Sequence, residues 1–324
     1  MKLQQRATRD IGAILGFLLK GEVDAIFKQQ PFELADHNSN PASSWRASSD
    51  ATRSLAPAPN AAQIGLLNET QLPVIKEIRR RRTFAKYYEA IDDYQFALVP
   101  ISALLAPQWF ADMDYIKELA GQIPDGASLE ELIRFSMAEG TVAEPIICGA
   151  QVIFSSNRPN IHAEPVPFVR EVDPGEFEIV VRANSRPNYV QVASIGGRLL
   201  LTNGVHHVCA LLLKGFDSVP CVVRSLGRIE ESGLNLQSTL FRPDLISGPR
   251  PALVVDFLND AVVVPLKLRS MYHVLRIGIG VEPIVIPAVL TSNQHQSRAW
   301  EPAISEPVNL NLDPLPDQLS TRRN

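Results

Sequence analysis

Cysteine is scarce in this chain, with three among 324 residues, at positions 148, 209 and 221. So few cysteines exclude a disulfide framework and are typical of a reducing compartment, so we expect a cytoplasmic location. Positive charge is not in excess either, because 31 Lys and Arg stand against 35 Asp and Glu and give a net charge of -4. This balance excludes a protein that coats nucleic acid over its whole surface, but it leaves room for a local basic patch.

Several functional signatures are also missing. The sequence has no Walker, Rossmann or zinc-ligand pattern and no Ser-His-Asp signature, so we expect no metal site. No apolar run is long enough to span a bilayer. Residues 11–19 are apolar and follow three basic residues, but Asp10 interrupts the entry and no small-residue cleavage site follows. We therefore expect neither a transmembrane helix nor a signal peptide.

Residues 1–63 have the sequence pattern of an attachment element. Apolar residues at positions 11–27 recur at helical spacing, which predicts an amphipathic helix within residues 1–35. Residues 36–63 are rich in Ser, Ala, Asn and Pro and predict a disordered linker. The helix is thus expected to be separable from the folded body and to bind a protein partner.

The segment 197–223 carries the strongest local signals. It predicts a strand at 198–202, a turn at Asn203-Gly204, a helix at 205–214 ended by Gly215, and a strand at 219–223. The first turn of such a helix presents backbone N–H groups and a positive dipole end, which favour a phosphate. The candidate phosphate-binding residues are Asn203, Gly204, Val205, His206 and His207.

This segment resembles the turn-helix-strand core of the ParB/sulfiredoxin-like superfamily. Members of that family carry Gly-x-(His/Arg)-Arg-x-x-Ala before a Lys-Gly pair and a Val-Pro strand. The matching residues are Gly204, His206, Ala210, Lys214, Gly215, Val219 and Pro220. Blocks at 99–104, 128–140 and 144–149 resemble the family's opening strand, its helix and its Pro-Ile strand, in the right order. The resemblance covers about residues 96–224.

Two departures from the family pattern bear on activity. His207 stands where the family has a phosphate-gripping arginine, and Val205 stands where sulfiredoxins have their catalytic cysteine. Sulfiredoxin activity is therefore not expected. Cys209 lies one helical turn further along, where a buried thiol is expected to be inert core.

The resemblance implies an α+β fold made of a ParB/sulfiredoxin-like core with additions. We expect that domain at residues 64–227, with a strand-rich insertion at 151–197. Beyond it, residues 228–290 predict a small sub-domain with strands at 262–268 and 281–289 and a helix or strand at 271–277. The tail at 291–324 is expected to be disordered.

A second candidate site is a run of four arginines in a predicted helix at 73–94. Arg79, Arg80, Arg81 and Arg82 suggest contact with phosphates or nucleic acid, with Tyr87 and Tyr88 available for stacking on bases. The alternative is a solvated face whose arginines pair with nearby acidic residues, which are Glu77, Glu89, Asp92 and Asp93.

Three functions remain open. The first is a ParB-like nucleotide- or phosphate-binding module that takes a nucleoside triphosphate with Mg and is coupled to DNA binding or to homo-oligomerisation. The second is a degenerate, non-catalytic member that acts as an interaction or scaffold protein through its N-terminal helix. The third is a nuclease or phosphotransferase that uses His206 with Glu144 or another nearby carboxylate. An open cleft beside Glu144 and Pro145 would favour the first, and a turn covered by apolar side chains would favour the second.

Overall fold

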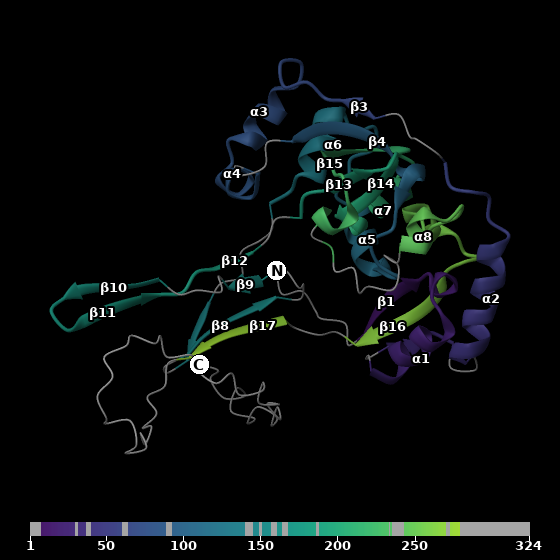
Figure 1. The fold of residues 1–324 in the computed structure, drawn as a ribbon, viewed down its shortest axis with the longest axis horizontal. Coiled ribbons are helices and arrows are strands. Elements are labelled where there is room, and N and C mark those ends of the chain that lie inside the picture. The colour runs from purple at the N-terminus through teal and green to yellow at the C-terminus, as the bar shows by residue number, and fades with distance from the viewer. Residues whose placement is uncertain are drawn as a thin grey trace, which may run out of the picture. The chain divides into compact units, whose positions relative to one another are not determined.

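The computed structural model describes residues 8–29, 32–36, 40–59, 64–88, 93–139, 145–148, 151–156, 161–163, 168–185, 188–232, 234, 243–269 and 273–278. Helices and several separate sheets make up this part of the chain, which confirms the predicted α+β class (Figure 1). Close contacts divide the chain into residues 1–279 and 280–324. The strand predicted at 281–289 and the tail predicted at 291–324 lie outside the described residues. None of the helices in the described part is both long and apolar enough to cross a membrane.

The prediction of one amphipathic helix at residues 11–27 is wrong. The segment forms β1 (Thr8–Ala13), η1 (Leu15–Phe17) and α1 (Lys20–Gln29). β1 lies inside a four-stranded sheet of order β2-β16-β1-β6, with β2 at Phe32–Leu34, β6 at Phe110–Asp112 and β16 at Val264–Arg269 (Figure 1). Ile11, Ile14 and Leu15 are buried in the main hydrophobic core. Residues 8–29 and 32–35 are therefore part of the folded body, and they do not form the expected separable helix.

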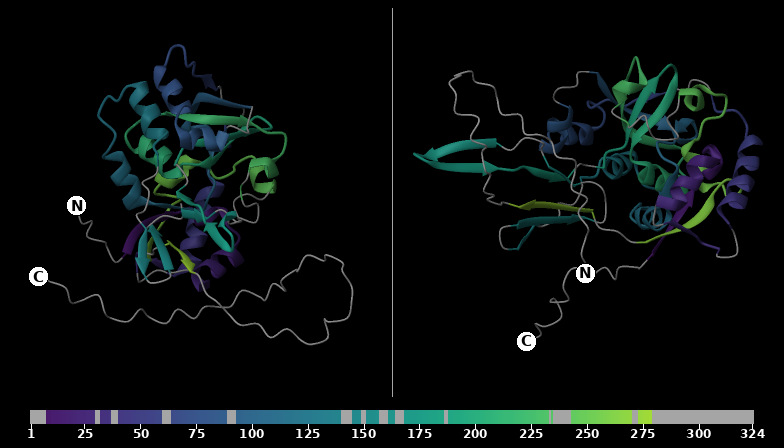
Figure 2. Two further views of the ribbon diagram at one scale, coloured as in Figure 1. Left: turned by 90° about the vertical axis from the view of Figure 1, so that its left-hand side faces the viewer. Right: turned by 60° about the horizontal axis from the view of Figure 1, so that its bottom comes forward.

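The prediction of a disordered linker at residues 36–63 is also wrong, because its centre forms α2 (Pro41–Arg53). The Asn40 side chain caps this helix by accepting from the Ser43 N–H at 2.8 Å. Ser48 Oγ donates to the Val262 carbonyl at 2.6 Å and accepts from the Gly16 N–H at 2.9 Å. Small polar residues, which suggested a linker, thus let α2 approach η1 closely, and Figure 2 shows α1 and α2 side by side.

A six-stranded mixed sheet forms the centre of the predicted domain. Its order is β3-β4-β15-β13-β14-β5. The strands are β3 (Gly65–Leu66), β4 (Tyr94–Pro100), β5 (Leu104–Leu105), β13 (Gln191–Ile195), β14 (Arg198–Asn203) and β15 (Ser218–Ser225). β15 pairs antiparallel with β4 and parallel with β13, and β14 pairs parallel with β5. Segments from both sides of the insertion therefore meet in one sheet.

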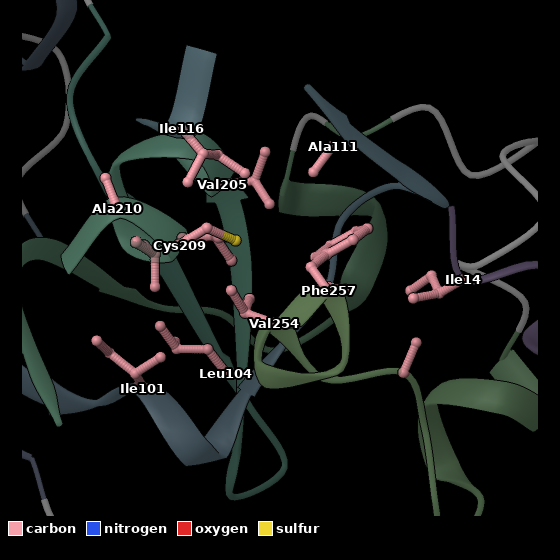
Figure 3. Close-up of a cluster of buried hydrophobic side chains, with 14 of the residues drawn as sticks. Ile14, Ile101, Leu104, Ala111, Ile116, Val205, Cys209, Ala210, Val254 and Phe257 are labelled. Carbon is pink, nitrogen blue, oxygen red and sulfur yellow. The ribbon is translucent and has the colours of Figure 1, made fainter. Parts of the chain in front are cut away.

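Helices and short 3-10 turns pack around these sheets. They are α3 (Pro73–Arg79), α4 (Arg82–Tyr88), η2 (Ile101–Ala103), α5 (Met113–Ala120), α6 (Leu129–Ser136), α7 (Val205–Leu213), η3 (Ile229–Ser232), α8 (Pro243–Ser247) and η5 (Val254–Leu258). Side chains from distant parts of the sequence meet in one core (Figure 3). Ile14, Cys209 and Phe257 belong to it and are almost fully buried. This shared core joins the N-terminal segment, α7 and η5.

The insertion is strand-rich, as predicted. It contains β8 (Gln151–Ser156), β9 (Ile161–Ala163), β10 (Phe168–Asp173), β11 (Glu176–Val180), β12 (Ala183–Ser185) and β13. β10 pairs with β11, and β9 pairs with β12. β8 lies in a three-stranded sheet of order β17-β8-β7, with β7 at Ile146–Cys148 and β17 at His273–Gly278.

The prediction of a separate sub-domain at residues 228–290 is wrong. The strand expected at 262–268 is present as β16, and the helix or strand expected at 271–277 is a strand, β17. However, β16 pairs with β1 near the N-terminus, and β17 pairs with β8 in the insertion. These pairings join residues more than one hundred positions apart, and local sequence patterns carry no information about them.

Candidate functional site

The turn before α7 has the geometry that the sequence predicts. β14 ends at Asn203, and Gly204 is left-handed with φ 95° and ψ 22° before the helix begins at Val205. The helix ends at Leu213, and Gly215 is again left-handed, with φ 84°. β15 then follows. Strand, turn, helix and strand are thereby confirmed, including both glycine positions.

Protein groups pack closely around this turn. Val205 and His207 are each 4% exposed, and the His207 ring lies 5.1 Å from the Phe135 ring. A Cβ on Gly204 would lie 2.9 Å from Val190 Cγ2, so the backbone of the turn is in contact with an apolar residue. Asn203 Nδ2 donates to the Tyr189 carbonyl at 2.9 Å.

These contacts bear on the predicted phosphate site. The side chains of Asn203, Val205 and His207 contact the protein itself, which favours a structural role for them. The predicted cleft would be bordered by Glu144, which lies outside the described residues, and by Pro145. Phosphate binding at Gly204, with or without a nucleotide and Mg, stays a prediction.

His206 connects α7 to the start of α5. Its Nε2 accepts from the Asp112 N–H at 3.1 Å, and its ring lies 5.3 Å from the Tyr115 ring. Asp112 caps α5 by accepting from the Tyr115 N–H at 2.9 Å, and it pairs with Arg9 of β1 at 2.9 Å. Burial raises the pKa of Asp112, while the Tyr115 N–H and Arg9 oppose that shift. An Nε2 that already accepts a backbone N–H is poorly placed to take a proton from a substrate.

The arginine run does not lie in one helix, so the prediction of a continuous helix at 73–94 is wrong. α3 ends at Arg79 and α4 begins at Arg82. Arg79 lies over the rings of Tyr94 and Phe96, at 5.4 and 5.6 Å from their centroids. Arg81 donates to the Met137 carbonyl at 2.8 Å and to Glu77 at 3.3 Å. Two of the four arginines therefore stabilise the fold.

The other two arginines have different surroundings. Arg80 and Arg82 are exposed, and neither forms an ion pair with any residue that the structure describes. Tyr88 is buried and stacks on Phe84 at 4.5 Å, so it is not available to a base, contrary to the prediction. The side chain of Tyr87 lies outside the described residues. Of the residues predicted to contact nucleic acid, Arg80 and Arg82 form an exposed basic surface.

The cysteines divide into two kinds. Cys209 and Cys221 are fully buried in the apolar core, and burial raises the pKa of both thiols above its usual range. Cys148 is exposed on β7. The buried thiols are therefore present in the protonated, unreactive form at neutral pH. Across the described ranges, no cluster of His, Cys, Asp and Glu has the arrangement of a metal site.

This contrast gives a prediction for thiol chemistry. One thiol per folded chain, that of Cys148, is expected to react rapidly with a chromogenic disulfide reagent at pH 7. All three are expected to react once the chain is unfolded in guanidinium. Cys148→Ser should abolish the native signal, whereas Cys209→Ser should leave it unchanged. Two reactive thiols in the folded protein would contradict the burial of Cys209 and Cys221.

No protein-family model, curated protein or solved structure matches this chain. The ParB/sulfiredoxin-like resemblance accordingly rests on the sequence motifs alone.

Proposed function

We propose that this chain is a non-catalytic interaction protein that associates with further copies of itself through the β10–β11 hairpin. The observation that carries the proposal is the exposure of large apolar side chains on this hairpin. Phe168, Phe177 and Ile179 are 57%, 60% and 58% exposed. Contiguous exposed apolar residues are typical of protein-binding surfaces.

Both faces of the hairpin carry these residues. Directly opposed residues of an antiparallel pair point to the same face. Val169 is opposite Ile179 on one face, and Phe168 is opposite Val180 on the other. A two-stranded hairpin has little stability of its own in water. A partner that covers one apolar face would stabilise it.

Charge indicates which partner fits. Residues 168–180 contain one arginine and four acidic residues, a net charge of -3. Arg80 and Arg82 are the complementary surface on this chain, because they are exposed and form no ion pair within the described part. Leu66 of β3 is a further exposed apolar residue of this chain, and it precedes Leu67, which packs against the cluster containing the buried residues of α3. A second copy can therefore supply both charge and apolar area.

Such a contact joins two different surfaces and is heterologous, so assembly is not limited to a dimer. We expect sedimentation velocity on the full chain to show association that weakens as salt is raised, because exposed charges are screened. Asp173→Lys with Glu176→Lys, or Arg80→Glu with Arg82→Glu, should each weaken association about tenfold or more. Combining the two charge reversals should restore it.

Replacing exposed apolar residues with serine, on the hairpin and elsewhere, tests whether the apolar face of the hairpin drives association. Phe177→Ser with Ile179→Ser should abolish association, whereas Leu19→Ser, at an exposed leucine on another part of the chain, should not. A chain that stays monomeric at low salt would overturn the proposal. Duplex DNA binding that is lost in the Arg80→Glu, Arg82→Glu variant, with association unchanged, would assign the arginines to nucleic acid instead.

A second candidate is the ParB-like phosphate-binding module. What supports it is the left-handed Gly204 directly before a nine-residue helix, an arrangement that suits an anion. Calorimetric titration of the full chain with nucleoside triphosphates and Mg tests it. Micromolar binding that is lost in Gly204→Val would favour this function over self-association alone. The nuclease or phosphotransferase alternative needs a carboxylate beside His206. Glu144 lies outside the described residues, and the carboxylate of the neighbouring Asp112 pairs with Arg9 and accepts from the Tyr115 N–H.

A further inference from the structure

A cavity of about 370 Å³ adjoins the six-stranded sheet, and its lining includes none of the residues of the α7 turn or of the hairpin. Leu105, Ile195, Leu200 and Ile246 form its apolar wall, and Arg198 and Arg228 contribute positive charge. Apolar walls with a few polar groups are typical of small-molecule sites, and the volume falls within their usual range.

Arg198 is held in place at this cavity. Its Nη2 donates to the carbonyls of Ser247 and Gly248, at 3.3 and 2.8 Å. Its Nη1 is buried and has no hydrogen-bond partner among the described residues. An unpaired buried donor is costly, and a charged donor prefers an anionic oxygen. The Arg198 side chain lines the cavity, and the two carbonyls fix its guanidinium there.

The charges at the cavity select among anions. Arg228 is largely exposed and pairs with Glu231 at 3.4 Å, so part of its charge is already compensated. Glu230, which also lines the cavity, is exposed and would repel a doubly charged group. A singly charged carboxylate fits this balance better than a phosphate does.

We infer that this cavity binds a small amphipathic carboxylate. The carboxylate accepts from the guanidinium of Arg198, and the hydrocarbon part lies against Ile195, Leu200 and Ile246. The site shares no residue with the hairpin or with the arginine pair of the proposed assembly, so each proposal can fail without the other.

The test compares linear carboxylates, from butanoate to decanoate, with alcohols of the same length by calorimetry on the full chain. Affinity for the carboxylates should rise about fourfold per added methylene until the cavity is filled, as expected from about 0.8 kcal/mol per buried CH₂. Alcohols should bind about tenfold more weakly, because a hydrogen bond to a charged group is lost. Equal affinity for both series, or no binding at millimolar concentration, would overturn the inference.

Variants locate the site. Arg198→Gln should weaken carboxylate binding about tenfold and leave alcohol binding unchanged, whereas Arg228→Gln should change either by about twofold at most. Ile195→Trp should fill the cavity and abolish binding of both series. Binding that survives both Arg198→Gln and Ile195→Trp would place the ligand elsewhere. The comparison of carboxylates with alcohols uses the unaltered chain, so it decides the question even if a variant fails to fold.

Discussion

Replacing Gly16 with alanine is expected to lower the free energy of unfolding by about 3 kcal/mol. The new Cβ would lie 2.4 Å from the Ser48 carbonyl oxygen and 2.5 Å from its carbon, which are backbone atoms of α2 and cannot rotate away. Relief requires α2 to shift as a unit. The shift would also break the bond from the Gly16 N–H to Ser48 Oγ. Urea unfolding followed by circular dichroism measures the loss.

Gly21 provides the matched control. It lies in α1, and a Cβ there would meet nothing within 4 Å. Gly21→Ala should therefore stabilise the protein by up to about 1 kcal/mol, the difference in helix propensity. Similar effects for the two substitutions would mean that α2 is not held against η1 as described, and the tethered-linker interpretation would regain support.

Asp256→Asn is expected to destabilise the protein by about 3 to 5 kcal/mol, because it leaves a guanidinium without its counter-ion. Asp256 is 1% exposed and accepts from Arg250 Nη2 at 2.5 Å, from Arg250 Nη1 at 3.1 Å, and from the Leu253 N–H at 2.8 Å. Arg250 also lies over the Phe17 ring at 5.8 Å from its centroid. The pair thus fixes η5 and touches the N-terminal segment.

Asp50 and Arg53 form the comparison pair on the surface of α2, with side chains 63% and 73% exposed. Asp50→Asn should change stability by less than about 1 kcal/mol, because an exposed pair is screened by solvent. Thermal unfolding of the two variants in one buffer separates the effects. A loss below 1 kcal/mol for Asp256→Asn would show that Arg250 finds another acceptor.

The parts of the fold that could be predicted depend on local signals. Gly204 and Gly215 adopt the left-handed backbone that favours glycine, and the apolar run between them forms a helix. The elements of segment 198–223 could therefore be predicted from the sequence. The same reasoning was wrong for residues 11–27. A segment that is buried on several sides is apolar along most of its length. The spacing of its apolar residues then fits a helix as well as it fits a strand followed by a tight turn.

In the candidate site, too, features set by local sequence were predictable and features set by distant contacts were not. That Gly204 begins a helix was predictable, but its contact with Val190 depends on how distant strands are arranged. Arg81 could not be distinguished from Arg80 in the sequence, because its carbonyl acceptor belongs to Met137, 56 residues away. In β11 the exposed Phe177 and Ile179 alternate with Glu176 and Glu178, as they would in a strand with one buried face. Whether a partner covers them is not encoded locally.

The pairing of β1 with β16 has a consequence for how the chain is made. Asp10 bonds to Lys267, 257 positions later, so a ribosome adding about 5 to 20 residues per second needs roughly 13 to 50 s between the two strands. β6, which pairs with the other edge of β1 through Ile11 and Asp112, emerges much earlier. During synthesis β1 can therefore be held on one side only, with Ile11 and its neighbours accessible to chaperones. The N-terminal sheet is completed after most of the chain has been translated, although it contains the first strand.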